Sequence, residues 1–195
     1  MAPSKLASPH TKKTKSRPLL TGKQKHRAKG SKHLLFFVLK NTKHQMEPDQ
    51  EFREFAESLM SHGVKFMIIG GYAVTAHGHP RYTGDIDFFV EKSSENAEKI
   101  VKAIHDFFGP LPNVQVENFL DDKRMSQLGD PPYRIDILVK ILGVTFAEAY
   151  PRSEMLELAG EKFPFIGLED LKANKRATGR YKDLGDLEAL ERLTD

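Results

Sequence analysis

The sequence predicts a fold of the α/β (α+β) class, in which a small mixed β-sheet is flanked by helices. Short apolar runs typical of buried strands alternate with segments in which apolar residues recur every three or four positions, as on one face of a helix. Near the C-terminus, two apolar runs flank a Gly-containing turn, which is typical of a β-hairpin. We find no internal repeat. The pattern therefore favours one domain of mixed strands and helices.

The first half of this domain is predicted to contain two helices and two strands. Residues 50–62 form the first helix, since their apolar side chains recur at helical spacing. The apolar run Phe66–Ile69 is a buried strand. Gly70-Gly71 then breaks the chain before a second helix that starts at about residues 72–77. The run Asp85–Val90 forms the next strand.

The second half begins with the clearest helix, over residues 94–108, which follows Ser93 as its N-cap and ends at Gly109-Pro110. The remaining predicted elements are, in chain order, a short strand Val114–Val116, a strand Arg134–Val139, a hairpin of Met155–Leu158 and Lys162–Ile166 around Ala159-Gly160-Glu161, and helices Leu168–Thr178 and about 182–193.

The charges divide the chain into a basic tail, residues 1–45, and a folded domain, residues 46–195. The tail holds 12 of the 30 Lys and Arg and no Asp or Glu, whereas the remainder has 18 basic and 27 acidic residues. With almost no apolar periodicity, the tail is expected to be disordered. It is interpreted as a nucleic-acid-binding arm, a targeting segment, or a segment outside the natural functional protein. Met46, followed by Glu47-Pro48 and a helix, fits the last interpretation.

Composition excludes several classes of site. The chain has no Cys, which rules out disulfides, thiolate zinc sites and a Cys nucleophile. Its longest apolar run, Leu34–Leu39, is far shorter than the roughly 20 residues that cross a bilayer. We therefore expect no membrane association and a cytoplasmic location. The acidic balance of residues 46–195 also argues against a basic, nucleic-acid-binding body.

Three carboxylates in two predicted strands form the central candidate site. Side chains alternate along a strand, so Asp85 and Asp87 project from one face while Ile86 points to the other. The same alternation in the second strand separates Asp136 from its apolar neighbours. Carboxylates on one face repel each other unless a cation lies between them, and hard ions such as Mg²⁺ take oxygen ligands. The pattern predicts a metal site at Asp85, Asp87 and Asp136.

Residues just before the carboxylate pair are candidates for binding phosphate. Gly70 and Gly71 lie between a strand and a helix, where glycine allows backbone N–H groups to approach a phosphate. Arg81 could pair with a triphosphate oxygen, and Thr83 could donate a hydrogen bond. A plain tight turn and solvated loop residues are the alternative interpretations.

These segments together carry a resemblance to a known superfamily. They are Gly70-Gly71-Tyr72-Ala73-Val74, His77-Gly78, Arg81-Tyr82-Thr83-Gly84-Asp85-Ile86-Asp87, and the C-terminal runs Leu168–Ala177, Gly179–Leu184 and Asp186-Leu187. In this order they resemble the signature of the nucleotidyltransferase superfamily related to DNA polymerase beta. They are most similar to its minimal bacterial and archaeal branch, which includes toxin and abortive-infection nucleotidyltransferases. The resemblance covers about residues 50–193 and not the tail.

The resemblance implies two catalytic metal ions, Mg²⁺ with Mn²⁺ as an alternative, and attack of an acceptor hydroxyl on the α-phosphate of a nucleoside triphosphate. By this resemblance Asp85 and Asp87 would bind both metals, and Asp136 would help to hold the one that activates the acceptor. Gly70 and Gly71 would cradle the triphosphate. Many relatives have Ser where this chain has Gly71, which leaves only the backbone to donate there.

The cations near the C-terminus are candidates for neutralising the departing pyrophosphate. They are Lys172, Lys175, Arg180 and Lys182. Lys172, Lys175 and Arg176 share one side of their helix by spacing, and a solvated basic face is the alternative interpretation. Asp183 is expected either to orient one of these cations or to cap the last helix.

The sequence thus predicts a metal-dependent nucleotidyltransferase that moves a nucleoside monophosphate from a nucleoside triphosphate onto a hydroxyl. The acceptor stays open between a tRNA end, a protein and a small molecule. An antitoxin-like protein is a candidate partner, and whether the chain acts in a toxin–antitoxin pair stays open as well. Two other functions compete: a catalytically inactive nucleotide-binding or toxin–antitoxin partner module, and a scaffold for a nucleic-acid-binding tail. The presence of all three carboxylates favours the enzyme.

Overall fold

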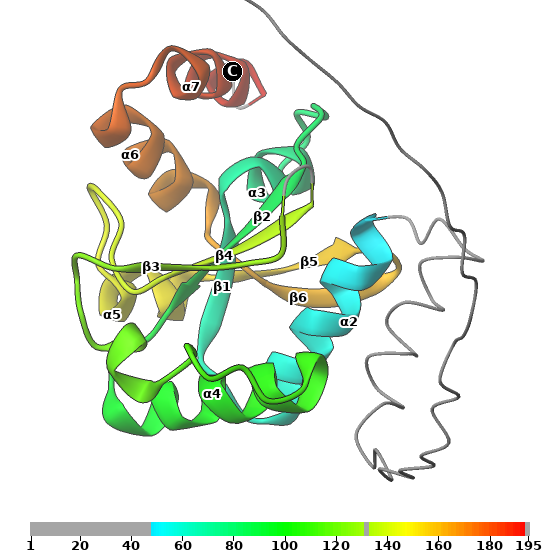
Figure 1. Ribbon diagram of the computed structural model, residues 1–195. Helices are drawn as coiled ribbons and strands as arrows, with labels where there is room; N and C mark the ends of the chain where they lie inside the picture. Colours follow the sequence, from blue (N-terminus) through cyan, green and yellow to red (C-terminus); the bar gives the residue numbers. More distant parts are fainter. Residues whose placement is uncertain (1–47, 131–132, 194–195) are drawn as a thin grey trace, which may run out of the picture.

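The computed structural model describes residues 48–130 and 133–193, so the predicted tail lies outside the described residues. Figure 1 shows a sheet with helices on both sides. The helices are α2 (Pro48–Ser61), α3 (Gly70–Ala76), α4 (Ser94–Phe108), α5 (Phe146–Ala149), α6 (Leu168–Thr178) and α7 (Tyr181–Arg192), with 3₁₀ helices η1 (Val116–Phe119) and η2 (Tyr150–Arg152). The strands are β1 (Phe66–Ile69), β2 (Asp85–Val90), β3 (Met125–Leu128), β4 (Arg134–Leu138), β5 (Glu154–Leu158) and β6 (Glu161–Phe165).

The six strands form one mixed sheet in the order β3-β4-β2-β1-β6-β5. Strands β1 and β2 are antiparallel, whereas β2 and β4 are parallel. The register of the parallel pair sets Asp85 beside Arg134, and Asp87 beside Asp136. The predicted α/β class with a small mixed sheet and flanking helices is therefore confirmed.

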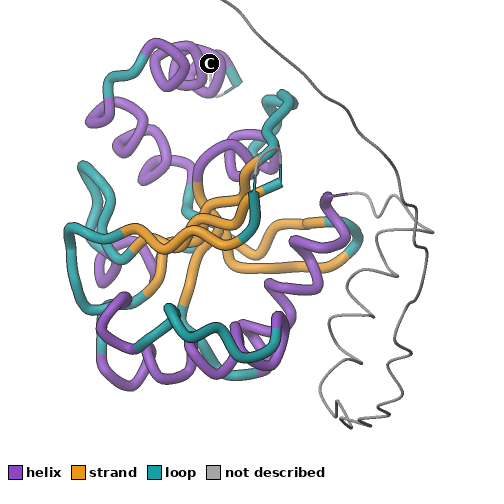
Figure 2. Tube along the Cα trace, in the orientation of Figure 1, coloured by secondary structure: helices purple, strands orange, loops and turns teal. Residues whose placement is uncertain are grey.

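The two faces of β2 have different surroundings. Phe88 points to the side of α2 and α4, where its ring meets Phe55 edge-on at 5.5 Å between centroids. Asp85 and Asp87 point to the opposite side, as does Phe89, whose ring contacts Phe146 of α5 at 5.2 Å. Figures 1 and 2 show α2 and α4 below the sheet and α6 and α7 above it. One face of β2 thus packs in the core, and the other face carries the two carboxylates.

Most predicted elements are confirmed with small shifts at their ends. Ser93 caps α4 as predicted, because its hydroxyl accepts a hydrogen bond from the Asn96 backbone N–H. Gly70 begins helix α3 instead of separating it from β1. The hairpin of β5 and β6 is confirmed, with Leu158 paired to Glu161.

The predicted strand Val114–Val116 is wrong, since Val116 starts the 3₁₀ helix η1. Gln115 and Asn118 exchange side-chain and backbone hydrogen bonds, and the Gln115 N–H donates to Asn118 Oδ1 at 2.7 Å. Such local bonds stabilise a helical turn in place of a strand. Strand β3 and helix α5 were not predicted, because both are only four residues long and β3 is largely exposed.

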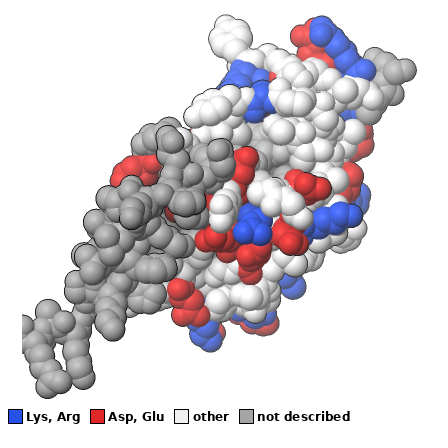
Figure 3. All heavy atoms as spheres, turned by 90° about the vertical axis from the view of Figure 1, so that its right-hand side faces the viewer, with Lys and Arg blue, Asp and Glu red and all other residues white. Residues whose placement is uncertain are grey.

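The surface seen in Figure 3 shows acidic and basic side chains interspersed, without a continuous basic face in that view. None of the described helices is both long and apolar enough to cross a membrane.

Candidate active site

A cavity of about 250 Å³ opens where β2 and β4 begin and β1 ends. We call it the carboxylate cavity. The residues that line it are Gly70, Gly71, Arg81, Thr83, Asp85, Asp87, Arg134, Asp136, Lys175, Arg180, Lys182 and Asp183. The structure thus brings together every residue predicted for the site except Lys172. Their catalytic and binding roles stay predictions.

The three carboxylates meet because β2 and β4 are parallel and in register. Asp85 and Asp87 alternate with buried Ile86 on β2, and Asp136 is the direct neighbour of Asp87 across the strand pair. Asp136 is only 4% exposed, whereas the Asp85 side chain is 39% exposed. The set therefore runs from the cavity mouth to its buried floor.

Arg134 lies in the middle of this set. Its Nε donates to Asp136 Oδ1 at 2.7 Å, and its Nη2 donates to Asp136 Oδ2 and to Asp85 Oδ2, both at 2.9 Å. Gln127 adds a longer bond of 3.3 Å to Asp136. A guanidinium therefore bridges two of the three carboxylates. Arg134 was not predicted as a site residue, although the alternation rule that grouped Asp85 with Asp87 also places it on the face of Asp136.

Asp87 has a different environment. Among the described residues, no ion pair or hydrogen bond reaches its carboxylate, and Lys175 and Arg180 act on it only through space. Burial and the neighbouring Asp136 carboxylate raise the pKa of Asp87 to about 6. Asp87 is thus a half-buried acid that, within residues 48–130 and 133–193, lacks a compensating cation in contact with it.

The two glycines make room for side chains of the site. A Cβ on Gly70 would lie 1.9 Å from Asp87 Oδ2, and the φ of Gly70 is +67°, a conformation that favours glycine. A Cβ on Gly71 would lie 2.7 Å from Thr83 Oγ1. Thr83 in turn donates to the Asp85 carbonyl at 3.2 Å. Glycine is required at both positions for the backbone to approach the carboxylate cavity.

The C-terminal helices hold their cations in a buried ion-pair network. Lys175, 4% exposed, lies 2.9 Å from Asp183 and 2.9 Å from Asp186. Asp186 also pairs with Arg81, at 2.7 Å from Oδ1 to Nε. Lys175 therefore does not lie on a solvated basic face, which was the alternative interpretation of these cations. Asp186 was not predicted, because its partner Arg81 is far away in the sequence.

Arg180 and Asp183 form the outer part of the network. The Arg180 Nε donates to Asp183 Oδ2 at 2.5 Å, and the Arg180 side chain is 75% exposed. Although burial opposes it, hydrogen bonds from Arg180 and Lys175 lower the pKa of Asp183 to about 2. Of the two expectations for Asp183, orienting the cations is the one that these contacts match.

Lys172 is the predicted site residue that the structure places elsewhere. It is buried and pairs with Glu169 at 3.1 Å, and it does not line the carboxylate cavity. Long helical side chains point toward the preceding turn, which is where Glu169 lies. Lys172 is thus neither in the cavity nor on a solvated face.

The carboxylates have the chemistry of a magnesium site, because all three offer hard oxygen ligands. Over residues 48–130 and 133–193, however, no three His, Cys, Asp or Glu side chains are already grouped to hold a metal ion. The guanidinium of Arg134 instead bonds to oxygens of both Asp85 and Asp136. A cation is thus accommodated between these carboxylates, and the residue types fit a divalent ion.

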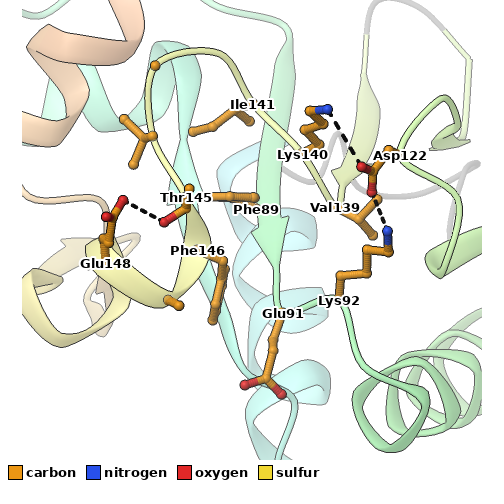
Figure 4. Close-up of a pocket in the computed structure, with 13 residues that line it drawn as sticks. Phe89, Glu91, Lys92, Asp122, Val139, Lys140, Ile141, Thr145, Phe146 and Glu148 are labelled. Carbon is orange, nitrogen blue, oxygen red and sulfur yellow. Dashed lines mark hydrogen bonds and ion pairs between the residues drawn. The ribbon is translucent and has the colours of Figure 1, made fainter.

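A second cavity, of about 630 Å³, lies at the other end of β2 and β4 (Figure 4). We call it the apolar cavity. Its lining includes Phe89, Val139, Ile141, Val144 and Phe146. On its rim, Asp122 pairs with Lys92 at 2.5 Å and with Lys140 at 3.6 Å. This cavity is larger, but it contains none of the predicted site residues.

Among solved structures, the chain is similar to a Thermotoga maritima protein provisionally described as a nucleotidyltransferase, with 19% identity, a TM-score of 0.45, and coverage of 78% of this chain and 94% of that one. A search of curated proteins finds no match.

A family model described as "Nucleotidyl transferase of unknown function (DUF2204)" matches residues 49–195. This match confirms the resemblance to the nucleotidyltransferase superfamily, while the toxin and abortive-infection branch stays a prediction. Because the match spans well over half of the sequence, the chain belongs to the family of nucleotidyl transferases of unknown function.

Proposed function

We propose that this protein is a metal-dependent nucleotidyltransferase that transfers a nucleoside monophosphate from a nucleoside triphosphate to an acceptor hydroxyl. The observation that carries the proposal is the convergence of Asp85, Asp87 and Asp136 in one cavity. The same cavity is lined by Arg81, Lys175, Arg180 and Lys182, so it offers ligands for a divalent cation beside cations for phosphate. Both are needed to hold a metal–triphosphate complex.

Asp85, Asp87 and Asp136 would hold the divalent ions, Mg²⁺ or Mn²⁺. When bound, such ions supply neutralisation of charge on the reacting phosphate and activation of the attacking oxygen. Asp87 suits this role because it is a half-buried carboxylate without a cation in contact among the described residues. Burial and the neighbouring Asp136 carboxylate raise its pKa, so a divalent ion beside it would favour its charged form.

The remaining residues would bind and orient the triphosphate. Gly70 and Gly71 let the backbone approach closely, because a side chain at either position would collide with the site. Arg180 and Lys182 are exposed at the cavity and can reach phosphate oxygens. Lys175 is held between two carboxylates, so it would act through its charge instead of by direct contact.

In the reaction, the acceptor oxygen forms a bond to the α-phosphorus, and the bond from this phosphorus to the oxygen bridging to the β-phosphate breaks. Pyrophosphate leaves with that oxygen, and the acceptor proton passes to solvent. Asp136 would orient the acceptor hydroxyl for in-line attack. Arg180 and Lys182 would stabilise the negative charge that grows on pyrophosphate.

The test is to incubate the full chain with Mg²⁺, each nucleoside triphosphate labelled on the α-phosphate, and tRNA, protein or aminoglycoside as acceptor. We expect label transfer and pyrophosphate release with one acceptor class. Asp87→Asn should abolish both, whereas Asp122→Asn, on the rim of the apolar cavity, should preserve them. Nucleotide binding without release of pyrophosphate for any acceptor class would contradict an enzyme and favour the inactive nucleotide-binding module.

A further inference from the structure

The contacts of Arg134 point to a role that neither the family nor the proposed reaction assigns. Its guanidinium engages both oxygens of Asp136 and one oxygen of Asp85. These are charge-assisted bonds, and the pair with Asp136 has the two parallel contacts of a fork. Because Asp136 is buried, the contacts form where water screens charge weakly. Arg134 thus offsets one of the negative charges that the carboxylates carry together.

A guanidinium and a divalent ion compete for the same carboxylates, because both are cations and they repel each other at close range. A divalent ion coordinates carboxylate oxygens directly at short range. An ion shared by Asp85, Asp87 and Asp136 would therefore favour withdrawal of Arg134 from its contact with Asp85. That contact is the one nearest to solvent, because Asp85 is 39% exposed and Arg134 is 25% exposed.

We propose that Arg134 is a positioning residue that holds Asp85 and Asp136 in the metal-free protein and is displaced from Asp85 when a divalent ion binds. This inference rests on the proposed function, since it concerns the same carboxylates. Arg134 competes with the divalent ion for ligands, so it weakens metal binding while it stabilises the metal-free site. A purely structural arginine would stabilise the fold without competing.

The position of Arg134 in the sheet supports this role. It begins β4, two residues before Asp136, and it is paired in register with Asp85 of β2. Its backbone is therefore held by the sheet, while its side chain, 25% exposed, lies at the cavity mouth. The third carboxylate, Asp87, is not engaged by Arg134, so the neutralisation is incomplete. A doubly charged ion would complete it.

The experiment measures Mn²⁺ binding to the full chain by electron paramagnetic resonance and calorimetry, without nucleotide. Arg134→Gln should bind Mn²⁺ roughly 10-fold or more tightly than the wild type, because the competing cation is gone. Arg134→Lys, which keeps the charge but loses the fork, should fall between them. Arg124→Gln removes an exposed arginine that pairs with Asp121, and it should leave the affinity unchanged.

Thermal unfolding gives a second readout. Without metal, Arg134→Gln should unfold at a lower temperature than the wild type, and saturating Mn²⁺ should raise its Tm by more than it raises that of the wild type. Should Arg134→Gln fail to fold, Arg134→Lys decides the question through its Mn²⁺ affinity. Unchanged or weaker Mn²⁺ binding by the folded Arg134 variant overturns the inference.

The outcomes also separate this inference from the proposed function. Failure of the wild type and of both Arg134 variants to bind Mn²⁺ would overturn the metal site itself. Binding by the wild type that is not strengthened in the variants would overturn only the role of Arg134. Binding by the variants alone would support the inference strongly, since Arg134 would then be the group that blocks the site.

Discussion

The two cavities lie along the same face of the sheet and differ in what fills them. In β2, Asp85 and Asp87 line the carboxylate cavity, and Phe89, two residues further on, lines the apolar cavity. The apolar cavity has about 630 Å³ and the carboxylate cavity about 250 Å³. The smaller one nevertheless holds nearly all of the residues that the motifs singled out. The volume of a cavity therefore says less about chemistry than the charges that the fold buries in it.

The two cavities differ in the free energy that is needed to bury their charged groups. Burying a carboxylate is unfavourable unless cations or hydrogen bonds compensate it. The carboxylate cavity meets this cost with Arg134, Lys175 and Arg81, whereas the ion pairs of the apolar cavity lie on its exposed rim. Buried, paired charges are common at functional sites, and this supports the proposal that the carboxylate cavity is the active site.

The sharpest test of this comparison is to make the same carboxylate-to-amide change in each cavity. Asp136→Asn should lower the rate of pyrophosphate release by roughly 100- to 1000-fold or more, because a buried metal ligand loses its charge. Glu148→Gln, in the apolar cavity, should leave the rate within about twofold. The rates are measured at saturating nucleotide and Mg²⁺. Equal effects of the two changes would show that the cavities do not differ in function.

The next effect concerns stability. Lys175→Met should lower the free energy of unfolding by about 3–5 kcal/mol, because it leaves Asp183 and Asp186 buried without their shared cation. Urea denaturation measures the change. Restoring most of the lost stability by adding Asp186→Asn to Lys175→Met would confirm that unpaired charge is the cause. A loss below about 1 kcal/mol for Lys175→Met would mean that water reaches this network.

The third prediction concerns how the free energy of unfolding of the metal-free protein depends on pH, through the carboxylate of Asp87. The pKa of Asp87 is about 6 in the folded state and close to 3.8 in the unfolded chain. The folded protein therefore binds this proton more tightly, so the stability contributed by Asp87 is present below about pH 4 and is lost as the pH rises through about 6. Asp87→Asn should remove this loss, so it should stabilise the protein more at pH 7 than at pH 4. A stability difference between variant and wild type that does not change with pH would contradict the raised pKa.

A core change in the apolar cavity should act on stability alone. Phe146 stacks on Tyr150 at 5.0 Å and meets Phe89 edge-on at 5.2 Å. Because Phe146 is only partly buried, Phe146→Ala should cost about 1–3 kcal/mol, below the usual value for a fully buried Phe. Mn²⁺ affinity, measured below the unfolding temperature, should match that of the wild type. Weakened Mn²⁺ binding would mean that the two cavities are coupled through β2.

The same contrast explains how much was predictable from the sequence. The alternation of Asp85, Ile86 and Asp87 sufficed to place two carboxylates on one face, because that rule depends only on local backbone geometry. That Asp136 joins them depends in addition on β2 and β4 being parallel neighbours in register, which alternation within one strand does not determine. Apolar periodicity located α2, α4 and β2 for the same local reason.

The errors arise where distant or very short segments decide the structure. Lys172 and Lys175 share a helix, yet Lys175 turns to Asp183 and Asp186 of α7 while Lys172 pairs with Glu169. Spacing along one helix cannot distinguish the two lysines, because the direction of each side chain depends on the acidic residue with which it pairs. The strand predicted at Val114–Val116 failed since hydrogen bonds between Gln115 and Asn118 outweigh a weak apolar pattern.

The smallest expected effect completes the comparison of the cavities. Lys92 on the rim of the apolar cavity pairs with Asp122 as Lys175 pairs with Asp183, but the Lys92 and Asp122 side chains are 43% and 42% exposed. Lys92→Met should therefore barely change the urea midpoint at physiological salt, because water and ions screen an exposed pair and Lys140 still faces Asp122. The ratio of the Lys175→Met effect to the Lys92→Met effect then measures what burial adds to the same Lys–Asp contact. A ratio near one would mean that water screens the Lys175–Asp183 pair as strongly as it screens the exposed Lys92–Asp122 pair. The two cavities would then not differ in their electrostatics.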